Sequence, residues 1–133
     1  MKNLPIIFTV FVFLFTVSNG LSYSQDVDLS GTWVGQTEVP EQGTDEITLV
    51  LEKIDSEYTG TASDSLGMLE DVECEDIEFK DGTLTFHFSI FDGYEYMTVW
   101  MNLKVDGDKM SGYWEVEDGT TGAIEMERVK KST

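Results

Sequence analysis

The chain has 133 residues, of which 26 are acidic and eight are basic, and its formal net charge at pH 7 is −18. This charge argues against nucleic acid and anionic membranes as partners, because both are bound through clustered cations. The single cysteine excludes an internal disulfide, so the hydrophobic core must hold the fold unaided.

Residues 1–24 match the pattern of a secretory signal peptide. Lys2 is followed by an apolar run from Leu4 to Val17 and then by small and polar residues. The run of about 14 residues is shorter than the roughly 20 that span a bilayer. The sequence therefore predicts a secreted or periplasmic protein without a membrane span in its mature form, and a single domain over residues 25–133.

Three alternating segments follow, and each predicts a strand with one apolar face. The loop between the first and the second is expected over Pro40–Asp45, where proline and glycine interrupt a polar stretch. A looser segment, Asp64–Glu70, follows the third. The apolar faces carry Trp33, Gly35 and Thr37, then Ile47, Leu49 and Leu51, then Tyr58, Gly60 and Ala62.

The acidic segment Glu70–Phe79 is predicted to be a fourth strand. Its alternation changes phase between Cys74 and Ile77, and a β-bulge near Glu75 and Asp76 restores a single buried face. Cys74 is expected to be a small, buried or half-buried side chain, because its acidic neighbours raise the pKa of its thiol and oppose the reactive thiolate. No calcium-loop motif is present, so no metal site is predicted.

Four turn motifs divide the rest of the chain into four more strands, and they are Asp81-Gly82, Asp92-Gly93, Asp106–Lys109 and Asp118–Thr120. Tight turns at these motifs keep one apolar face throughout, because none of them reverses the parity of a strand. The pairs expected across them are Phe79 with Leu84, Phe88 with Met97, Met101 with Trp114, and Trp114 with Ile124.

About eight short sequential strands without helical periodicity predict an all-β fold, an eight-stranded antiparallel up-and-down barrel. Closure of the sheet removes its exposed edges. It also leaves an interior for side chains or for one small ligand.

Two features of this barrel resemble the calycin superfamily. Gly31-Thr32-Trp33 opens the first strand and Arg128 lies near the end of the last, so the two meet at one end of a barrel with an even number of strands. In calycins a G-x-W tryptophan packs against such a basic residue and closes the barrel bottom. The resemblance implies that Trp33 is buried, with the Arg128 guanidinium within about 6 Å of it.

The run Leu29–Trp33 also looks like the first strand of avidins. More broadly, the mature chain resembles small lipocalin-like domains of exported bacterial proteins. In those domains D-G-D-K turns are followed by an apolar residue, Ser or Thr, and Gly, as in Asp106–Gly112 here. The resemblance implies a lipocalin-like fold with room for a ligand, and it names no ligand.

The first functional hypothesis is a binding module that holds a small apolar ligand inside the barrel. The alternative is that large side chains fill the interior, so the hypothesis requires a void of at least about 300 Å³. The inward side chains expected to contact the ligand are Phe86, Phe88, Met97, Met101 and Trp114.

The rival hypothesis is a ligand-free interaction or structural domain that docks protein or carbohydrate on its outer face. Coverage of that face by the segment Asp64–Glu70 is a further alternative. The outer aromatic side chains are Phe91, Tyr94, Tyr96, Trp100 and Tyr113, and the last four are the candidate docking residues. Tyr96 is expected beside Ser89, Trp100 beside Thr85, and Tyr113 beside Asn102.

An enzyme is not predicted, and neither is a cofactor. His87 is the one histidine, and the register places it on the outer face beside Thr98 and Asp76, without a serine or cysteine partner. A surface histidine is therefore favoured over a catalytic base or a zinc ligand.

Overall fold

The computed structural model describes residues 27–91 and 93–130, so the predicted signal peptide, residues 1–24, lies outside the described residues. No helix in the described part of the chain is long and apolar enough to cross a membrane. The strands of this part are β1 Gly31–Val39, β2 Gly43–Ile54, β3 Glu57–Asp64, β4 Val72–Glu73, β5 Glu75–Lys80, β6 Thr83–Phe91, β7 Tyr96–Asp106, β8 Lys109–Val116 and β9 Thr121–Arg128.

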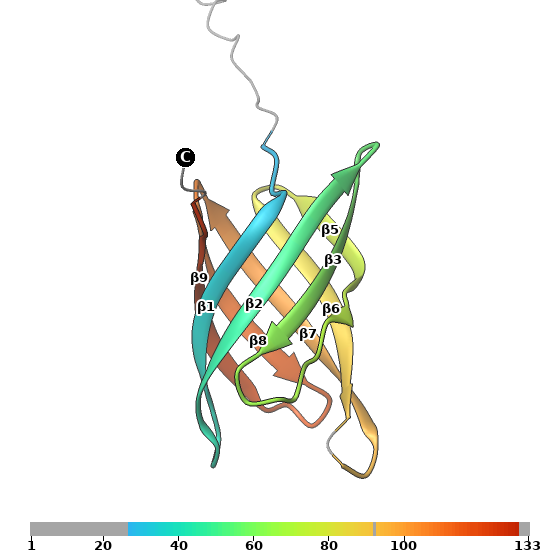
Figure 1. Cartoon of the computed structure of the whole chain (residues 1–133), viewed down its shortest axis with the longest axis vertical. Helices are drawn as coiled ribbons and strands as arrows, with labels where there is room; N and C mark the ends of the chain where they lie inside the picture. The colour runs from blue at the N-terminus through green and yellow to red at the C-terminus, as the bar shows by residue number, and fades with distance from the viewer. Residues whose placement is uncertain (1–26, 92, 131–133) are drawn as a thin grey trace, which may run out of the picture.

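These nine strands form one antiparallel sheet that curls into a nearly closed barrel (Figure 1). Their order around the barrel is β4-β3-β2-β1-β9-β8-β7-β6-β5, so almost every strand pairs with its neighbours in sequence. The predicted all-β antiparallel barrel is confirmed, and its connections agree with an up-and-down arrangement. The strand count is nine within the described residues, because the expected fourth strand is divided in two.

The divided strand brings the two edges of the sheet together. β4 pairs with β3 whereas β5 pairs with β6, and only Cys74 separates them. The register of β5 against β6 shifts between Glu75 and Glu78, and Asp76 there adopts a φ of 53°. The predicted β-bulge is therefore confirmed, and it lies where the chain passes from one edge of the sheet to the other.

The inward faces are those expected, although two pairings differ. Phe88 lies opposite Val99 rather than Met97, because the chain from Phe91 to Tyr96 is longer than a two-residue turn. Trp114 lies opposite Gly122 rather than Ile124. Both differences are two residues, and a shift of two keeps every side chain on its face. The pairings of Phe79 with Leu84 and of Met101 with Trp114 are confirmed.

The loop predicted over Pro40–Asp45 is shorter than expected, since β2 already begins at Gly43. Asp45 belongs to this strand and lies opposite Thr37 of β1. The alternation of β2 directs its carboxyl into the barrel, where it is 1% exposed. This difference matters for the site described below.

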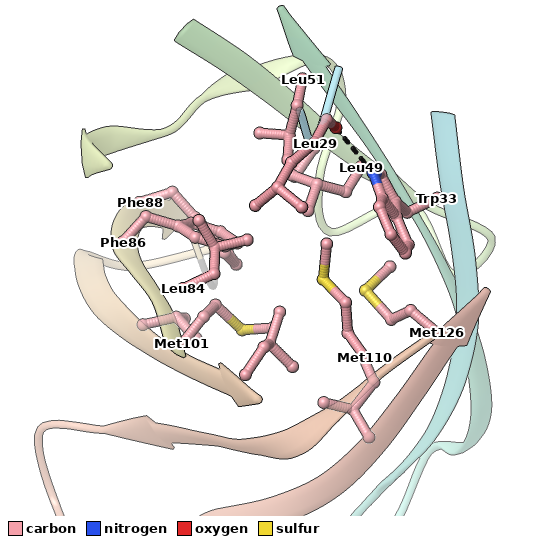
Figure 2. Close-up of a cluster of buried hydrophobic side chains, with 14 of the residues drawn as sticks. Leu29, Trp33, Leu49, Leu51, Leu84, Phe86, Phe88, Met101, Met110 and Met126 are labelled. Atoms are coloured by element: carbon pink, nitrogen blue, oxygen red, sulfur yellow. Dashed lines mark hydrogen bonds between the residues drawn. The ribbon is translucent and has the colours of Figure 1, made fainter. Parts of the chain in front are cut away.

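The barrel has a closed end, where β1 begins and β9 ends, and an open end, where β1 ends and β2 begins (Figure 1). At the closed end Trp33 is fully buried and donates its indole N–H to the carbonyl oxygen of Leu29 at 3.0 Å. Figure 2 shows Met110 and Met126 beside this indole. Leu29 is also fully buried, so this half of the barrel is packed with side chains.

The expected contact between the first and last strands is present at the closed end. The guanidinium carbon of Arg128 lies 4.5 Å from the centroid of the Trp33 ring. The same guanidinium donates hydrogen bonds to the carbonyl oxygens of Ser30 and Asp28 and to the carboxylate of Asp108. Arg128 therefore stacks on the tryptophan and ties the chain before β1 to β9 and to the β7–β8 turn.

Candidate ligand-binding site

A cavity of about 260 Å³ lies within the open end of the barrel. Inward side chains of β1, β2, β6, β7, β8 and β9 form its wall, and the segment 65–71 contributes Met68 and Leu69. Apolar side chains make up most of this wall. Its polar lining residues are Thr37, Gln42, Asp45, Asp118 and Thr120.

Four of the five side chains predicted to contact a ligand line this cavity: Phe88, Met97, Met101 and Trp114. The fifth, Phe86, does not. It lies two residues nearer the closed end on β6, where it is buried in the core with its ring centroid 6.2 Å from that of Phe88.

The cavity of about 260 Å³ falls short of the void of about 300 Å³ that the binding hypothesis required, so the hypothesis fails for a ligand of drug size and is open only for a smaller one. The reason is that the closed half of the barrel is filled, so only the open half is hollow. The side chains that fill the closed half are Leu29, Trp33, Leu84, Leu103, Met110 and Met126. A filled core and a ligand cavity were alternative predictions for the whole barrel interior. In the structure the closed half is filled with side chains, and the open half contains the cavity.

The position of Trp114 in the cavity wall is fixed by hydrogen bonds. Its indole N–H donates to Thr37 Oγ1 at 2.8 Å, and the Thr37 hydroxyl donates in turn to the carbonyl oxygen of Ala123 at 2.6 Å. A Cβ at Gly122 would lie 2.5 Å from the indole ring, so glycine there leaves the space that the ring occupies. This part of the wall is therefore formed before any ligand binds.

Asp45 is the site residue that the sequence analysis missed. Its Oδ1 atom accepts hydrogen bonds from the Ser65 hydroxyl at 3.3 Å and from the Leu66 N–H at 3.2 Å. Burial, together with the neighbouring Asp64 carboxyl, raises the pKa of Asp45 to about 6. The alternation of Ile47 and its neighbours, extended two residues back, would have placed Asp45 on the inward face.

The segment 65–71 borders the cavity through Met68 and Leu69. Asp64 Oδ1 accepts hydrogen bonds from the N–H groups of Gly67 at 3.1 Å and Leu69 at 2.8 Å, and the Leu69 side chain is buried. This segment does not cover the outer aromatics, since Trp100 and Tyr113 are 45% and 47% exposed. The alternative in which it covers them is therefore wrong.

A second hollow, of about 400 Å³, lies on the outer face and is flanked by Trp100 and Tyr113. Tyr113 lies beside Asn102 as expected. Two other expected neighbours are wrong because of the shift between β6 and β7. Trp100 lies opposite His87 rather than Thr85, and Tyr96 lies opposite Phe91 rather than Ser89. Tyr94 and Tyr96 are at the β6–β7 connection, 93% and 73% exposed.

His87 and Cys74 are the two remaining side chains that the sequence analysis considered as reactive groups. His87 faces Trp100 rather than Thr98, and its Nε2 atom hydrogen bonds the expected partner, Asp76, at 2.7 Å. Cys74 is half-buried, as expected, and burial raises the pKa of its thiol to about 12. The cause is desolvation rather than the acidic neighbours, and it disfavours the reactive thiolate.

Binding is the chemistry that this arrangement supports most directly. Among residues 27–91 and 93–130, no three His, Cys, Asp or Glu side chains are grouped so that they could hold a metal ion. The sequence matches no protein-family model, no curated protein and no solved structure. The functional argument therefore depends on the cavity, its lining and its charges.

Proposed function

We propose that this protein is an exported binding module that holds a small apolar ligand in the open end of its barrel. One observation carries the proposal: an apolar cavity opens at one end of a barrel whose other half is filled. Protein interiors are close-packed, and an unfilled space loses packing energy. A preformed apolar cavity with a few polar groups at its mouth favours a ligand.

The size of the cavity limits the ligand. Its volume of about 260 Å³ is below the range of about 300 to 1,000 Å³ found for drug-sized ligands. The ligand is therefore a compact apolar molecule, or one whose polar end remains at the mouth beside Asp118 and Thr120, which are both exposed.

The methionines allow a direct test of ligand position. Met68, Met97 and Met101 line the cavity, whereas Met110 and Met126 are buried at the closed end. Titration of hexanol into the mature protein should shift the first three methyl resonances in NMR spectra and leave the other two nearly unchanged. Equal shifts at both ends, or none, would contradict the proposal.

A pair of matched variants tests whether the cavity is needed. Val116→Phe fills the cavity from its wall, whereas Val105→Phe adds the same volume at a partly buried position outside the cavity lining. We expect the first to abolish hexanol binding and the second to retain it. Native mass spectrometry of the protein purified from its host would identify a natural ligand directly.

We also propose that the barrel is lipocalin-like and that the protein is secreted or periplasmic. The Trp33–Arg128 contact at the junction of the first and last strands supports the first statement. The signal-peptide pattern of residues 1–24 supports the second. Mass spectrometry of the protein from its host should find an N-terminus near Gln25, and retention of Met1 would contradict export by cleavage.

The outer hollow supports a second candidate function, the docking of carbohydrate. Trp100 and Tyr113 offer exposed rings on which a sugar can stack, and Asn102 and Glu115 beside them offer hydrogen-bonding groups. A glycan array separates the two functions. Binding that is lost in Trp100→Ala and kept in Val116→Phe would assign the outer face, and no retained glycan would remove this candidate.

A further inference from the structure

Two neighbouring carboxyl groups accept hydrogen bonds from the segment 65–71, which borders the cavity through Met68 and Leu69. Asp45 extends from β2 and Asp64 from β3, and the Asp64 carboxyl is near enough to help raise the pKa of Asp45 through its charge and its hydrogen bonding. Together they hold the segment, because their Oδ1 atoms accept N–H donors from Leu66, Gly67 and Leu69. Asp45 also belongs to the cavity lining.

One oxygen of this pair is left without a donor. Asp64 Oδ2 is buried and has no hydrogen-bond partner within the described residues. An unpaired buried acceptor is unfavourable, and more so if the group is charged. A proton shared between the two carboxyls relieves this deficit at low pH. At neutral pH the site lacks a positively charged donor.

The charges that line the cavity favour some ligand groups over others. Two acidic residues, Asp45 and Asp118, line the cavity, and among residues 27–91 and 93–130 no Lys, Arg or His side chain does. The whole chain has a formal net charge of −18. A carboxylate ligand would therefore meet repulsion, and a cation would be attracted. A calcium ion needs six or more oxygen ligands, which this pair cannot supply.

We propose that the cavity binds an amphipathic primary amine, with its ammonium group at Asp45, which has Asp64 as its neighbour, and its apolar part against Phe88, Met97 and Trp114. This inference rests on the proposed function and specifies the chemical class of its ligand. An ammonium group has three N–H donors and carries the positive charge that the carboxyl pair lacks. The apolar part then enters the hollow half of the barrel.

Binding of the amine should depend on pH. The groups facing Asp45 are Thr37 from β1, Asp64 from β3, and Ser65 and Leu66 from the loop, and of these Asp64 is titratable. Asp45 holds a proton below its pKa of about 6, and that proton competes with the ammonium group. Alkylamines remain protonated throughout this range. Affinity for the amine should therefore rise as pH increases through about 6.

The test compares hexylamine, hexanol and hexanoate, which share one alkyl chain, in wild-type protein and in two variants. Calorimetry gives the affinities, and the Met68, Met97 and Met101 methyl resonances give the position of the ligand. We expect wild-type protein at about pH 7.5 to bind hexylamine at least about tenfold more tightly than hexanol, and hexanoate most weakly.

Asp45→Asn should reduce the preference for amine over alcohol to about twofold or less, while hexanol affinity stays similar. Glu46→Gln makes the same change of charge one residue away, at an exposed position, and should retain the full preference. If Asp45→Asn does not fold, the comparison of the three ligands in wild-type protein still decides the matter.

The outcomes separate this inference from the function on which it rests. Equal affinity for amine and alcohol, with shifts at the three cavity methionines, would retain the binding module and overturn the amine preference. A preference that survives Asp45→Asn would also overturn it. Failure of hexanol and hexylamine alike to shift these resonances would remove both proposals.

Discussion

The two ends of the barrel treat their buried polar groups in opposite ways. At the closed end the Trp33 N–H and each of the three guanidinium nitrogens of Arg128 donate to an oxygen acceptor, and buried side chains such as Leu29 and Met126 pack there. At the open end two carboxyls meet under a loop, one buried oxygen has no donor within the described residues, and a cavity remains. Stability is concentrated at the first end, and the second retains the capacity to bind.

The largest expected effect comes from removing a tryptophan at each end. Trp33→Ala should lower the free energy of unfolding by about 4 kcal/mol, because the indole is fully buried and hydrogen-bonded. Trp114→Ala should lower it by about 2 kcal/mol, since this side chain is only half-buried and already borders a cavity. Urea denaturation would measure both. A larger loss from Trp114 would reverse the assignment of stability to the closed end.

The next effect concerns the cation at the closed end. Arg128→Ala should lower the free energy of unfolding by about 2 kcal/mol, because stacking on Trp33 and several hydrogen bonds are lost together. Lys130→Ala, at an exposed position two residues later, makes the same change of charge and should have almost no effect. Equal small effects of the two variants would remove the main support for the calycin-like interpretation.

The sequence predicted the closed end better than the open end, and the reason is geometric. Alternation determines which face each side chain occupies, so the buried positions of Trp33 and Leu49 followed from parity alone. The contact of Trp33 with Arg128 followed from the direction of the first and last strands. These inferences survive errors of two residues in a turn, because such errors do not change the face.

The open end depends on the lengths of its connections, which alternation does not determine. The β6–β7 turn was predicted too short and the β8–β9 turn was placed one residue too late, so both pairings were displaced by two residues. Asp45 was assigned to a loop because proline and glycine interrupt the polar stretch Pro40–Asp45, although parity would have placed it inside the barrel. The proximity of Asp45 to Asp64 depends on the pairing of β2 with β3, and no local sequence pattern predicts it.

The third prediction concerns a substitution at the open end that should raise the free energy of unfolding, whereas the substitutions above lower it. The pKa of Asp45 is raised above its ordinary value to about 6, so this carboxyl favours folding when protonated, and its contribution is lost as pH rises from about 4 to about 6. In Asp45→Asn the amide N–H₂ can donate as the shared proton does. We expect this variant to be about 1 to 2 kcal/mol more stable than wild type at about pH 7.5.

Urea denaturation at several pH values would show this difference directly. The stabilisation by Asp45→Asn should shrink towards pH 4, where the wild-type carboxyl holds its proton. Glu46→Gln, with the same charge change at an exposed position, should show no such pH dependence. A variant that is less stable than wild type at every pH would mean that the ionised Asp45 carboxylate is required to hold the loop.

The smallest expected effect is that of salt, and it distinguishes surface charge from the buried charges at the two ends. With a formal net charge of −18, the protein should gain stability as salt rises from low concentration to about 0.15 M, because self-repulsion on the surface is screened. We expect Tm to rise by about 3 °C, which corresponds to roughly 0.5 kcal/mol for a domain of this size.

Two variants separate surface charge from buried charge. Asp45→Asn should show the same rise in Tm as wild type, since buried charges are screened little by salt. Arg128→Ala should show a slightly larger one, because it has lost the partly exposed ion pair with Asp108 that salt weakens. A wild-type Tm that falls steadily with salt would mean that ion pairs such as this one outweigh the net repulsion.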